Sequence, residues 1–563
     1  METGAEEESD ASSRPRRSVT SLVIVAALLC CAACGAGAEP AGAGPTEIAF
    51  APGPGGRPRL ILFIVIDQGG ARDLLRYRSL YHGGLARLLD TGALFTDAHH
   101  EHAVTVTAAG HAALATGSYP SRSGIIDNEW FDRTARKEVY CVEDETYQRS
   151  PANLRGTALG DWLKDADGAS KVFAASGKDR AAVLMGGHTA DGAFWYDVYS
   201  GRFTSSGYYP ESEPAWLKAF NDRELTDVHF GTLWNALPLD GVDLAALDIL
   251  DITGGPVRSG FPHAIGSFSL IPDAGYHNSF FFTPFVDDEL ASFATTLIDE
   301  EDLGGDEHLD LLALGFSALD TVGHTWGPNS REFVDTLLHL DRSLGDLLDH
   351  LDAKIGRERL LVTLSADHGV LPLPEYLESV GRPGRRTGPE DIACVQQAGR
   401  VLEKSLGAGQ WILKFPYLNY SLIAERNLTR QQVEDELVRA LTACAAVRQV
   451  WTRTQMESNH PPDDPIFRLY THSFDPARSG DLFVQYQEGF LATTRLGTNH
   501  GSPYSYDTHV PVLIAGPGVT PGPIAQHIAT VDVAPTVAAL IGVAPPGTID
   551  GVDRSALLRR PAP

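Results

Sequence analysis

The clearest pattern along the chain is a set of continuous apolar runs that end close to an acidic residue. Residues 59–67 and 359–367 each end in aspartate, and residues 309–316 are soon followed by Asp320. Runs that are apolar at every position are typical of strands buried on both faces of a parallel sheet. Residues 510–516 form a fourth such run. Because ligands of open α/β sheets gather at the carboxyl ends of the strands, the three acids predict a site at that edge.

Helical patterns separate these runs. Residues 330–355 carry leucines close to helical spacing, residues 83–92 end in a stop glycine, and residues 531–542 close the chain in the same way. This alternation predicts an α/β fold with a mainly parallel central sheet and helices on both faces.

Two stretches fit the alternation poorly. Residues 192–303 are rich in glycine, aromatic residues and turns, and residues 372–487 hold an amphipathic helix at 429–443 among short strands. We expect both to be cap-like insertions that cover the core and shape its site. The catalytic core then consists of three segments, namely residues 58–191, 304–371 and 488–563.

Composition and charge narrow the choice of partners. The 563 residues are 43% hydrophobic, which is ample for a large core, and the formal net charge is −28. Such a charge argues against nucleic acid or an anionic membrane as the main partner. An enzyme that processes anions in this field needs metals or local cations at its site.

The N-terminus has the pattern of an export signal. Arg14, Arg16 and Arg17 precede an apolar run of about 12 residues, which suits a signal peptide and is too short to span a bilayer. We expect a signal peptide at residues 1–34, a flexible linker at 35–57, and a periplasmic or cell-surface location. A short membrane anchor is the alternative. The residues around Cys34 leave open a lipoprotein signal, in which Cys34 would carry a lipid anchor.

The cysteine content argues against cysteine as a metal ligand. After the signal, Cys141, Cys394 and Cys444 are too few and too dispersed for a disulfide framework or a cysteine-based zinc site. One disulfide is compatible with an oxidising compartment, with Cys394 and Cys444 as the candidate pair, and the sequence does not decide whether it forms. Metal ligands would therefore be histidine and aspartate.

Such residues occur at spacings suited to metal binding. Asp320 and His324 lie one helical turn apart, so both can reach one metal. The pair Asp367-His368 stands where a strand ends, and His500 lies on a glycine-flanked loop. Each has an ordinary reading alone, as a helix cap or a surface histidine. Together, at strand ends and glycine-rich loops, they predict a metal site.

The stretch 102–111 supplies a candidate nucleophile. Its small and hydroxyl-bearing residues lead into a helical pattern at 111–116, where helix amides can meet an anion. We predict that Thr107 is the nucleophile of a phosphoryl transfer, with Thr105 as the competing hydroxyl.

Several short motifs follow one another between residues 59 and 558. They are Val65-Ile-Asp67-Gln68, Thr107-Ala-Ala-Gly-His111, Gly124-Ile-Ile-Asp-Asn128-Glu-Trp130, Lys178-Asp-Arg180, Asp320-Thr-Val-Gly-His324, Asp367-His368-Gly369, and Asn499-His500-Gly501 ahead of Tyr506-Asp-Thr-His509-Val-Pro511. In this order they resemble the alkaline phosphatase superfamily, and most closely the phosphate-irrepressible alkaline phosphatases of bacterial periplasms.

The resemblance implies two zinc ions per chain. One would be held by Asp320, His324 and His500, and the other by Asp67, Asp367, His368 and the alkoxide of Thr107. A threonine hydroxyl is too weak an acid to ionise near neutral pH, and coordination would lower its pKa enough for attack on phosphorus. The other metal would stabilise the leaving oxygen, and water would then hydrolyse the phosphothreonine.

The resemblance also implies donors for the phosphoryl oxygens, namely Asn128, Lys178 and Arg180. Fixed cations favour a monoester dianion over a diester, which has one charge fewer. A solvated Lys-Asp-Arg turn is the ordinary alternative, and Asp179 is expected to be a local structural partner.

Other histidines are expected to lie outside the ligand sets. The family pattern assigns no ligand role to the run His99, His100 and His102, and His111 is interpreted as structural. His509 is the alternative to His500 as the last zinc ligand. We prefer His500, because its glycine-flanked loop better matches the loop of the superfamily.

The predicted function is that of an exported metal-dependent phosphatase acting on small-molecule phosphate monoesters. The alternative is a phosphodiesterase or nucleotide pyrophosphatase of the same superfamily. A sulfatase would need a Cys/Ser-x-Pro-x-Arg motif at the nucleophile, and a non-catalytic surface binding protein would not need the complete ligand set.

Overall fold

The computed structural model describes residues 57–250, 260–493 and 496–559. The expected signal peptide with Cys34, and the linker up to residue 56, lie outside the described residues. Within those three ranges, no helix is both long enough and apolar enough to cross a membrane.

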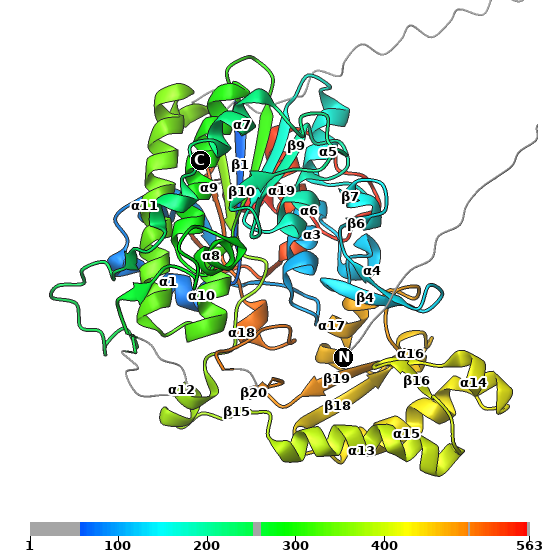
Figure 1. Cartoon of the computed structure of the whole chain (residues 1–563). Helices are drawn as coiled ribbons and strands as arrows, with labels where there is room; N and C mark the ends of the chain where they lie inside the picture. Colours follow the sequence, from blue (N-terminus) through cyan, green and yellow to red (C-terminus); the bar gives the residue numbers. More distant parts are fainter. Residues whose placement is uncertain (1–56, 251–259, 494–495, 560–563) are drawn as a thin grey trace, which may run out of the picture. The chain divides into compact units, whose positions relative to one another are not determined.

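A nine-stranded sheet forms the core (Figure 1), with the order β10-β9-β8-β13-β1-β14-β21-β2-β22. Its parallel centre consists of β9 (Gly192–Asp197), β8 (Val172–Ser176), β13 (Asp310–Phe316), β1 (Leu60–Ile66) and β14 (Leu360–Ser365). Strands β2 (Ala93–Phe95) and β22 (Gly522–Ile524) pair in parallel at one edge. The three predicted runs that lead to acids are therefore the adjacent strands β13, β1 and β14.

The register of these strands brings their ends to one edge. Ile66 of β1 lies opposite Phe316 of β13, and Val65 lies opposite Ser365 of β14. Asp67 and Asp367 therefore leave the sheet side by side, as the apolar runs predicted.

The fourth apolar run behaves differently. It forms β21 (Val512–Ala515), which is buried but antiparallel to both β14 and β2. The expectation of a further parallel strand is wrong here, because burial on both faces produces the same apolar run in either direction. The edge strand β10 (Arg202–Thr204) is antiparallel as well. The sheet is mainly parallel, as predicted.

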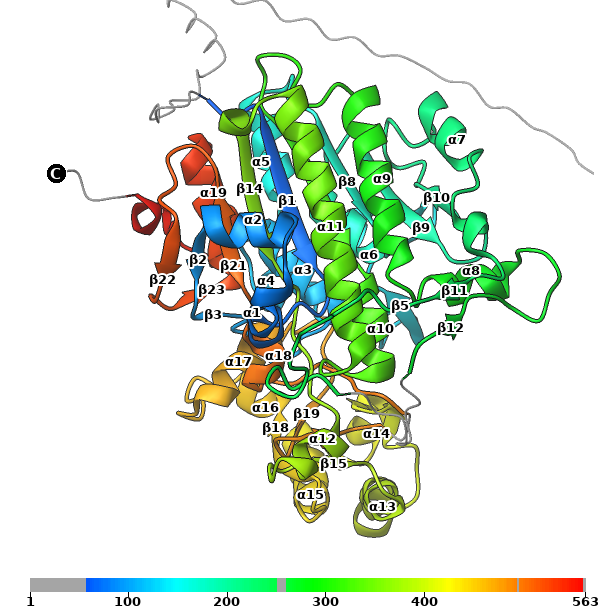
Figure 2. The same ribbon diagram turned by 90° about the vertical axis from the view of Figure 1, so that its left-hand side faces the viewer.

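Alternate residues of β1 pack into two different cores, one on each face of the sheet. Leu60, Leu62, Ile64 and Ile66 join the core beneath α2 (Gly84–Thr91), α9 (Phe285–Glu300) and α11 (Arg331–Lys354), which cover one face (Figure 2). Ile61, Phe63 and Val65 join the core beneath α3 (Thr107–Thr116), α5 (Leu159–Ala166), α6 (Asp179–Gly186) and α19 (Val533–Ile541). Because both faces are covered, every position of the strand is apolar.

The helix predictions are confirmed, with one difference in extent. Helix α11 starts after Ser330, whose hydroxyl accepts a hydrogen bond from Phe333 N, and α2 ends just before Gly92. Helix α3 begins at Thr107, four residues before the predicted start. Its alanines and glycine are buried all round, so they leave no apolar stripe for a periodicity argument to find.

The sequence predicts an insertion at residues 192–303, but the two ends of this range belong to the core. They start with β9 and β10 of the central sheet and end with α9, which packs against α11 and β13. Between these elements, α7 (Ala215–Asn221) packs against β10 and α9.

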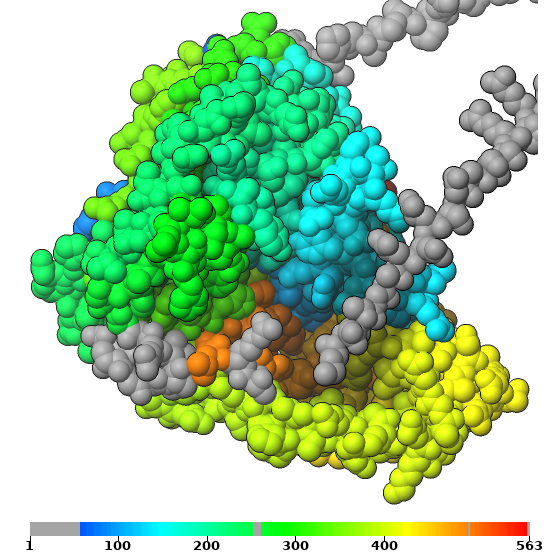
Figure 3. All heavy atoms as spheres, viewed as in Figure 1, coloured from blue at the N-terminus to red at the C-terminus, as the bar shows by residue number. Residues whose placement is uncertain are grey.

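Residues 372–487 have a hydrophobic core of their own. It lies among α13 (Pro389–Leu406), α15 (Arg430–Thr442), β18 (Val447–Thr452) and β19 (Leu482–Tyr486). This part (yellow in Figure 3) contacts the earlier segment near residue 133 (cyan), where Arg133 pairs with buried Asp481 at 2.8 Å.

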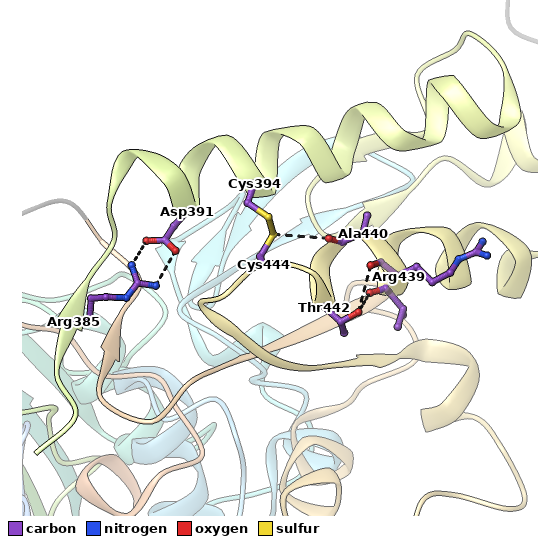
Figure 4. The surroundings of a disulfide bond; sticks show 8 residues. Arg385, Asp391, Cys394, Arg439, Ala440, Thr442 and Cys444 are labelled. Atoms are coloured by element: carbon purple, nitrogen blue, oxygen red, sulfur yellow. Dashed lines mark hydrogen bonds and ion pairs between the residues drawn. A yellow bond between two sulfur atoms is a disulfide. The ribbon is translucent and has the colours of Figure 1, made fainter.

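Cys394 and Cys444 form a disulfide that joins α13 to the turn after α15 (Figure 4). The bond closes a sequence separation of 50 residues. In the described part of the chain, Cys141 is a buried free thiol.

Replacing both Cys394 and Cys444 by serine is expected to lower the free energy of unfolding of this part by about 2–4 kcal/mol, because the bond restricts the unfolded loop. Calorimetry without reductant measures the shift. Reductant should bring the wild type to the same level and leave the double variant unchanged. Equal unfolding temperatures for the oxidised wild type and the double variant would contradict the expectation.

Candidate active site

Three buried carboxylates meet at the carboxyl edge of the sheet. Asp67 follows β1, Asp367 follows β14, and Asp320 lies on α10 (Ala318–Trp326), the helix after β13. Their exposed fractions are 0%, 0% and 4%. Buried charges of one sign are costly unless cations or metals compensate them.

One set of ligand atoms comes from Asp67, Asp367 and His368, which lie within 4.8 Å of one another. His368 Nε2 is 3.5 Å from Asp67 Oδ1 and 3.4 Å from Asp367 Oδ2. All three atoms are buried without a hydrogen-bond partner among the described residues. His111 Nδ1 lies 3.2 Å from Asp367 Oδ2, but its hydrogen bond goes to the Thr107 carbonyl at 2.8 Å. Unsatisfied buried atoms of this kind fit a bound cation.

A second set surrounds Asp320. His324 Nε2 is 3.1 Å from Asp320 Oδ1, and His500 Nε2 is 3.6 Å from the same oxygen. His368 also lies within 4.8 Å of Asp320 and His500, and its ring stacks on that of His500 at 3.5 Å. His368 therefore lies between the two sets.

Backbone carbonyls orient the three imidazoles in the same way. The Nδ1 atoms of His324, His368 and His500 lie 2.9, 3.0 and 2.7 Å from the carbonyls of Thr498, Gly369 and Thr105. An Nδ1–H that donates to a carbonyl assigns the Nε2 lone pair to the site, which is the usual arrangement of metal-binding histidines.

The carboxylates differ in their electrostatic surroundings. Burial, followed by the charges of Asp320 and Asp367, raises the pKa of Asp67 well above its ordinary value. Burial also acts to raise the pKa of Asp320, but the charges of His324 and Lys178 outweigh it and hold that pKa well below the usual range. The site therefore needs positive charge to keep all its carboxylates ionised.

Cations come from the start of α6. Lys178 Nζ donates to Asp67 Oδ2 at 2.5 Å and to Asp320 Oδ2 at 2.6 Å, so it bridges the two ligand sets. Arg180 Nη2 lies 3.4 Å from Thr107 Oγ1. Asp179 between them pairs with Arg149 instead, at 2.5 Å.

Thr107 is the first residue of α3 and is 1% exposed. The next amide, Ala108 N, donates to Asn128 Oδ1 at 2.9 Å, which places Asn128 beside the start of the helix. Gly110 permits the close approach of α3 to the strand end, because a Cβ there would lie 2.1 Å from the Asp367 carbonyl. The glycine of the Thr-x-x-Gly-His motif is therefore a packing requirement.

Gln68 belongs to the site, although the sequence assigned it no role. Its Nε2 donates to Asp320 Oδ1 at 2.8 Å, and its backbone N donates to Asp367 Oδ1 at 3.1 Å. Its φ of 67° is uncommon for a residue other than glycine. A Cβ on Gly323 would lie 1.8 Å from Gln68 Oε1, so a side chain at that position would displace the Gln68 amide. In the sequence, the one indication of this role is that a polar residue directly follows Asp67, the acid at the end of the strand.

The competing residues lie elsewhere. Thr105 Oγ1 donates to the Ser502 carbonyl at 2.9 Å. His509 Nε2 faces the Thr96 carbonyl at 3.0 Å, and its ring stacks on His99. His102 is buried against His100.

Comparison with known proteins agrees with this geometry. Residues 61–509 match the family described as type I phosphodiesterase / nucleotide pyrophosphatase. The chain is 33% identical over 511 residues to alkaline phosphatase PafA of Elizabethkingia meningoseptica, covering 86% of this chain and 92% of that protein. It is 33% identical over 522 residues to alkaline phosphatase PhoK of Sphingomonas sp., covering 88% and 90%.

A crystal structure of wild-type PafA matches with a TM-score of 0.79 and 31% identity, covering 89% of this chain and 99% of that one. The chain therefore belongs to the type I phosphodiesterase / nucleotide pyrophosphatase family of the alkaline phosphatase superfamily, and it is a metal-dependent phosphoric ester hydrolase of the PafA type.

Proposed function

We propose that this chain hydrolyses small-molecule phosphate monoesters through a phosphothreonine on Thr107, at a site for two zinc ions. The observation that carries the proposal is the pair of cations at the start of α6, of which Lys178 is buried. Lys178 bridges Asp67 and Asp320, and Arg180 reaches the Thr107 hydroxyl.

The donor types of both sets fit zinc, whose usual ligands include imidazole nitrogens and carboxylate oxygens. In the set of Asp67, Asp367 and His368, three such atoms are buried without a hydrogen-bond partner in the described part of the chain. Asp320, His324 and His500 would hold one ion, and Asp67, Asp367, His368 and Thr107 the other. Bound zinc would lower the pKa of the Thr107 hydroxyl and stabilise negative charge on the leaving oxygen.

The side chains of the protein position the reaction. Thr107 Oγ1 forms the bond to phosphorus as the bond to the leaving alcohol breaks, and water later cleaves the phosphothreonine to release phosphate. The first turn of α3 presents its amide end to the anion. Because Asn128 Oδ1 is taken by Ala108 N, its amide NH₂ is the group that would donate to a phosphoryl oxygen.

Charge favours a monoester. The charges of Asp320 and Asp67 outweigh burial and raise the pKa of Lys178, so it remains protonated. Arg180 is also charged, since neighbouring Tyr140 and Asp179 outweigh burial in raising its pKa. Two fixed cations match the dianion of a monoester better than the monoanion of a diester.

A solved variant of PafA supports the same four residues. That structure carries substitutions of a threonine, an asparagine, a lysine and an arginine, and it matches this chain with a TM-score of 0.80 and 30% identity. Thr107, Asn128, Lys178 and Arg180 have the same types and order, and the Thr-to-Asn and Lys-to-Arg separations are also the same, whereas the Asn-to-Lys separation is shorter here.

Kinetics on a matched pair of substrates test the proposal. We expect kcat/KM for p-nitrophenyl phosphate to exceed that for bis-p-nitrophenyl phosphate by about 10²-fold or more, the range that positioned charge contributes to catalysis. A strong preference for the diester would instead support the phosphodiesterase alternative.

The variants Lys178→Ala and Arg180→Ala are each expected to lower kcat/KM for the monoester by about 10²–10³-fold, and to lower diester hydrolysis less. Steady-state kinetics on both substrates measure the difference. Arg122→Ala is the matched control, because Arg122 is half-exposed and pairs with Asp550. Equal losses on both substrates would contradict the role assigned to the cations.

We also propose export to the periplasm or cell surface, which the disulfide supports because such bonds persist in oxidising compartments. Cell fractionation, with mass spectrometry of the mature N-terminus, would detect cleavage after the signal or a lipid on Cys34. A full-length chain found in the cytoplasm would refute the proposal.

A further inference from the structure

A second group of carboxylates and imidazoles lies apart from the candidate active site. It stands where β3 (Ala98–His99) pairs with β23 (Ile528–Ala529). Asp97, His99 and His527 each offer one ligand atom, and these atoms lie within 4.8 Å of one another. We call these three residues the outer cluster.

The fold, rather than local sequence, assembles the outer cluster. Ile528 N donates to the Asp97 carbonyl at 3.0 Å, so His527 is brought beside Asp97 by the parallel pairing. Asp97 and His99 are two residues apart along an extended segment and therefore project to the same side.

Distances within the cluster suit a small divalent ion. His99 Nε2 is 3.1 Å from Asp97 Oδ1, and His527 Nδ1 is 3.2 Å from Asp97 Oδ2. Around a tetrahedral zinc with bonds of 2.0–2.1 Å, ligand atoms are separated by about 3.3 Å. These contacts are also hydrogen-bond distances, and they hold the two imidazoles on the two oxygens of one carboxylate. The same separations suit an ion that replaces the shared protons.

The other nitrogens of both rings have partners of the kind that metal-binding histidines use. His527 Nε2 lies 3.0 Å from Glu101 Oε1, and Glu101 Oε2 accepts a hydrogen bond from Tyr119 OH at 2.8 Å. His99 Nδ1 lies 3.2 Å from Thr508 Oγ1. A carboxylate or hydroxyl at the second nitrogen fixes the tautomer and directs the first nitrogen to the metal.

We propose that the outer cluster is a further zinc-type metal site. The His527 and Asp97 side chains are 51% and 49% exposed, which leaves room for water as an additional ligand. A bound ion would cross-link segments that are far apart in the chain. A short path also joins the outer cluster to the catalytic region. His100 follows His99, and its Nε2 lies 2.9 Å from the carbonyl of Ala366, the residue before Asp367.

Zinc content of the full chain tests the proposal. Wild type, His99→Ala and His527→Ala are stripped with chelator, reloaded with zinc, desalted and analysed by elemental mass spectrometry. We expect each variant to hold one zinc per chain fewer than wild type while retaining its phosphatase activity. His308→Ala is the matched control, since His308 is a partly exposed histidine paired with Asp167, and it should hold as much zinc as wild type.

The outcomes separate this proposal from that for the active site. Equal zinc content in wild type and both variants would overturn the outer site and leave the proposed function untouched. Loss of zinc together with activity would place the missing ion at the catalytic carboxylates and would also overturn it. Should His527→Ala fail to fold, as judged by circular dichroism, His527→Gln and Asp97→Asn give the same comparison.

Discussion

Replacing Thr107 by alanine is expected to lower kcat by about 10⁴-fold or more and to leave the zinc content close to that of wild type. The loss follows because the proposed covalent step has no other acceptor of the phosphoryl group. Zinc should remain because each ligand set keeps three protein side chains without Thr107. Steady-state kinetics and elemental analysis of the same preparation measure both quantities.

Thr105→Ala is the matched control. Thr105 is buried two residues away and its hydroxyl donates to the Ser502 carbonyl, so the variant should keep activity within about tenfold of wild type. Acid-quenched wild type incubated with radiolabelled substrate should carry label on Thr107. Wild-type rates in Thr107→Ala, or label on Thr105, would refute the assignment.

Removal of bound metal is expected to eliminate hydrolysis and to lower the unfolding temperature, with both restored by zinc. Without metal, Asp67, Asp320 and Asp367 share a buried site in which Lys178 pairs with Asp67 and Asp320. A ligand that binds only the native chain adds about 2.7 kcal/mol to stability at a hundredfold excess over its dissociation constant. Activity, zinc content and calorimetry after chelation and reloading provide the measurements.

The stability of the metal-free protein should also depend on pH in a defined direction. The pKa of Asp67 is raised in the native state, so native chains hold a proton that unfolded chains release above about pH 4. The contribution of Asp67 to the free energy of unfolding should therefore fall as the pH rises through the range between the two pKa values, and bound zinc should reduce this slope.

The ligand variant Asp320→Asn has Asp335→Asn as its matched control. Asp335 is a buried carboxylate outside the site that accepts hydrogen bonds from Trp234 and Leu237. The control should leave zinc content unchanged, whereas Asp320→Asn should reduce it. Full activity in chelator, with well under one metal per chain, would contradict a catalytic role for metal.

Much of the site could be predicted because it lies at strand ends that have a strong local signature. Strands β1, β13 and β14 are buried on both faces, so their runs are apolar throughout and the acids that follow them are conspicuous. The spacing of Asp320 and His324 fits one turn of α10 without reference to any other part of the chain. The resemblance then assigned functional roles to residues that, from their local sequence alone, could equally be helix caps, surface histidines or a solvated turn.

Other features depended on contacts between distant segments. The run that became β21 has the burial of a parallel strand, but its direction follows from its connections. Gln68 joined the site only through a left-handed backbone turn, and His368 came to lie between both ligand sets through its stacking on His500. The outer cluster exists because β23 pairs with β3.

For this protein, the sequence by itself determined which segments are buried, which residues end the central strands, and which chemistry those residues support. Only the tertiary structure decided strand direction, the partners of each imidazole, and the meeting of His99 with His527. The physical reason is the distance along the chain over which each interaction acts. Burial and helical period act on neighbouring residues and leave a repeating pattern, whereas pairing across hundreds of residues is settled by the packing of the whole chain.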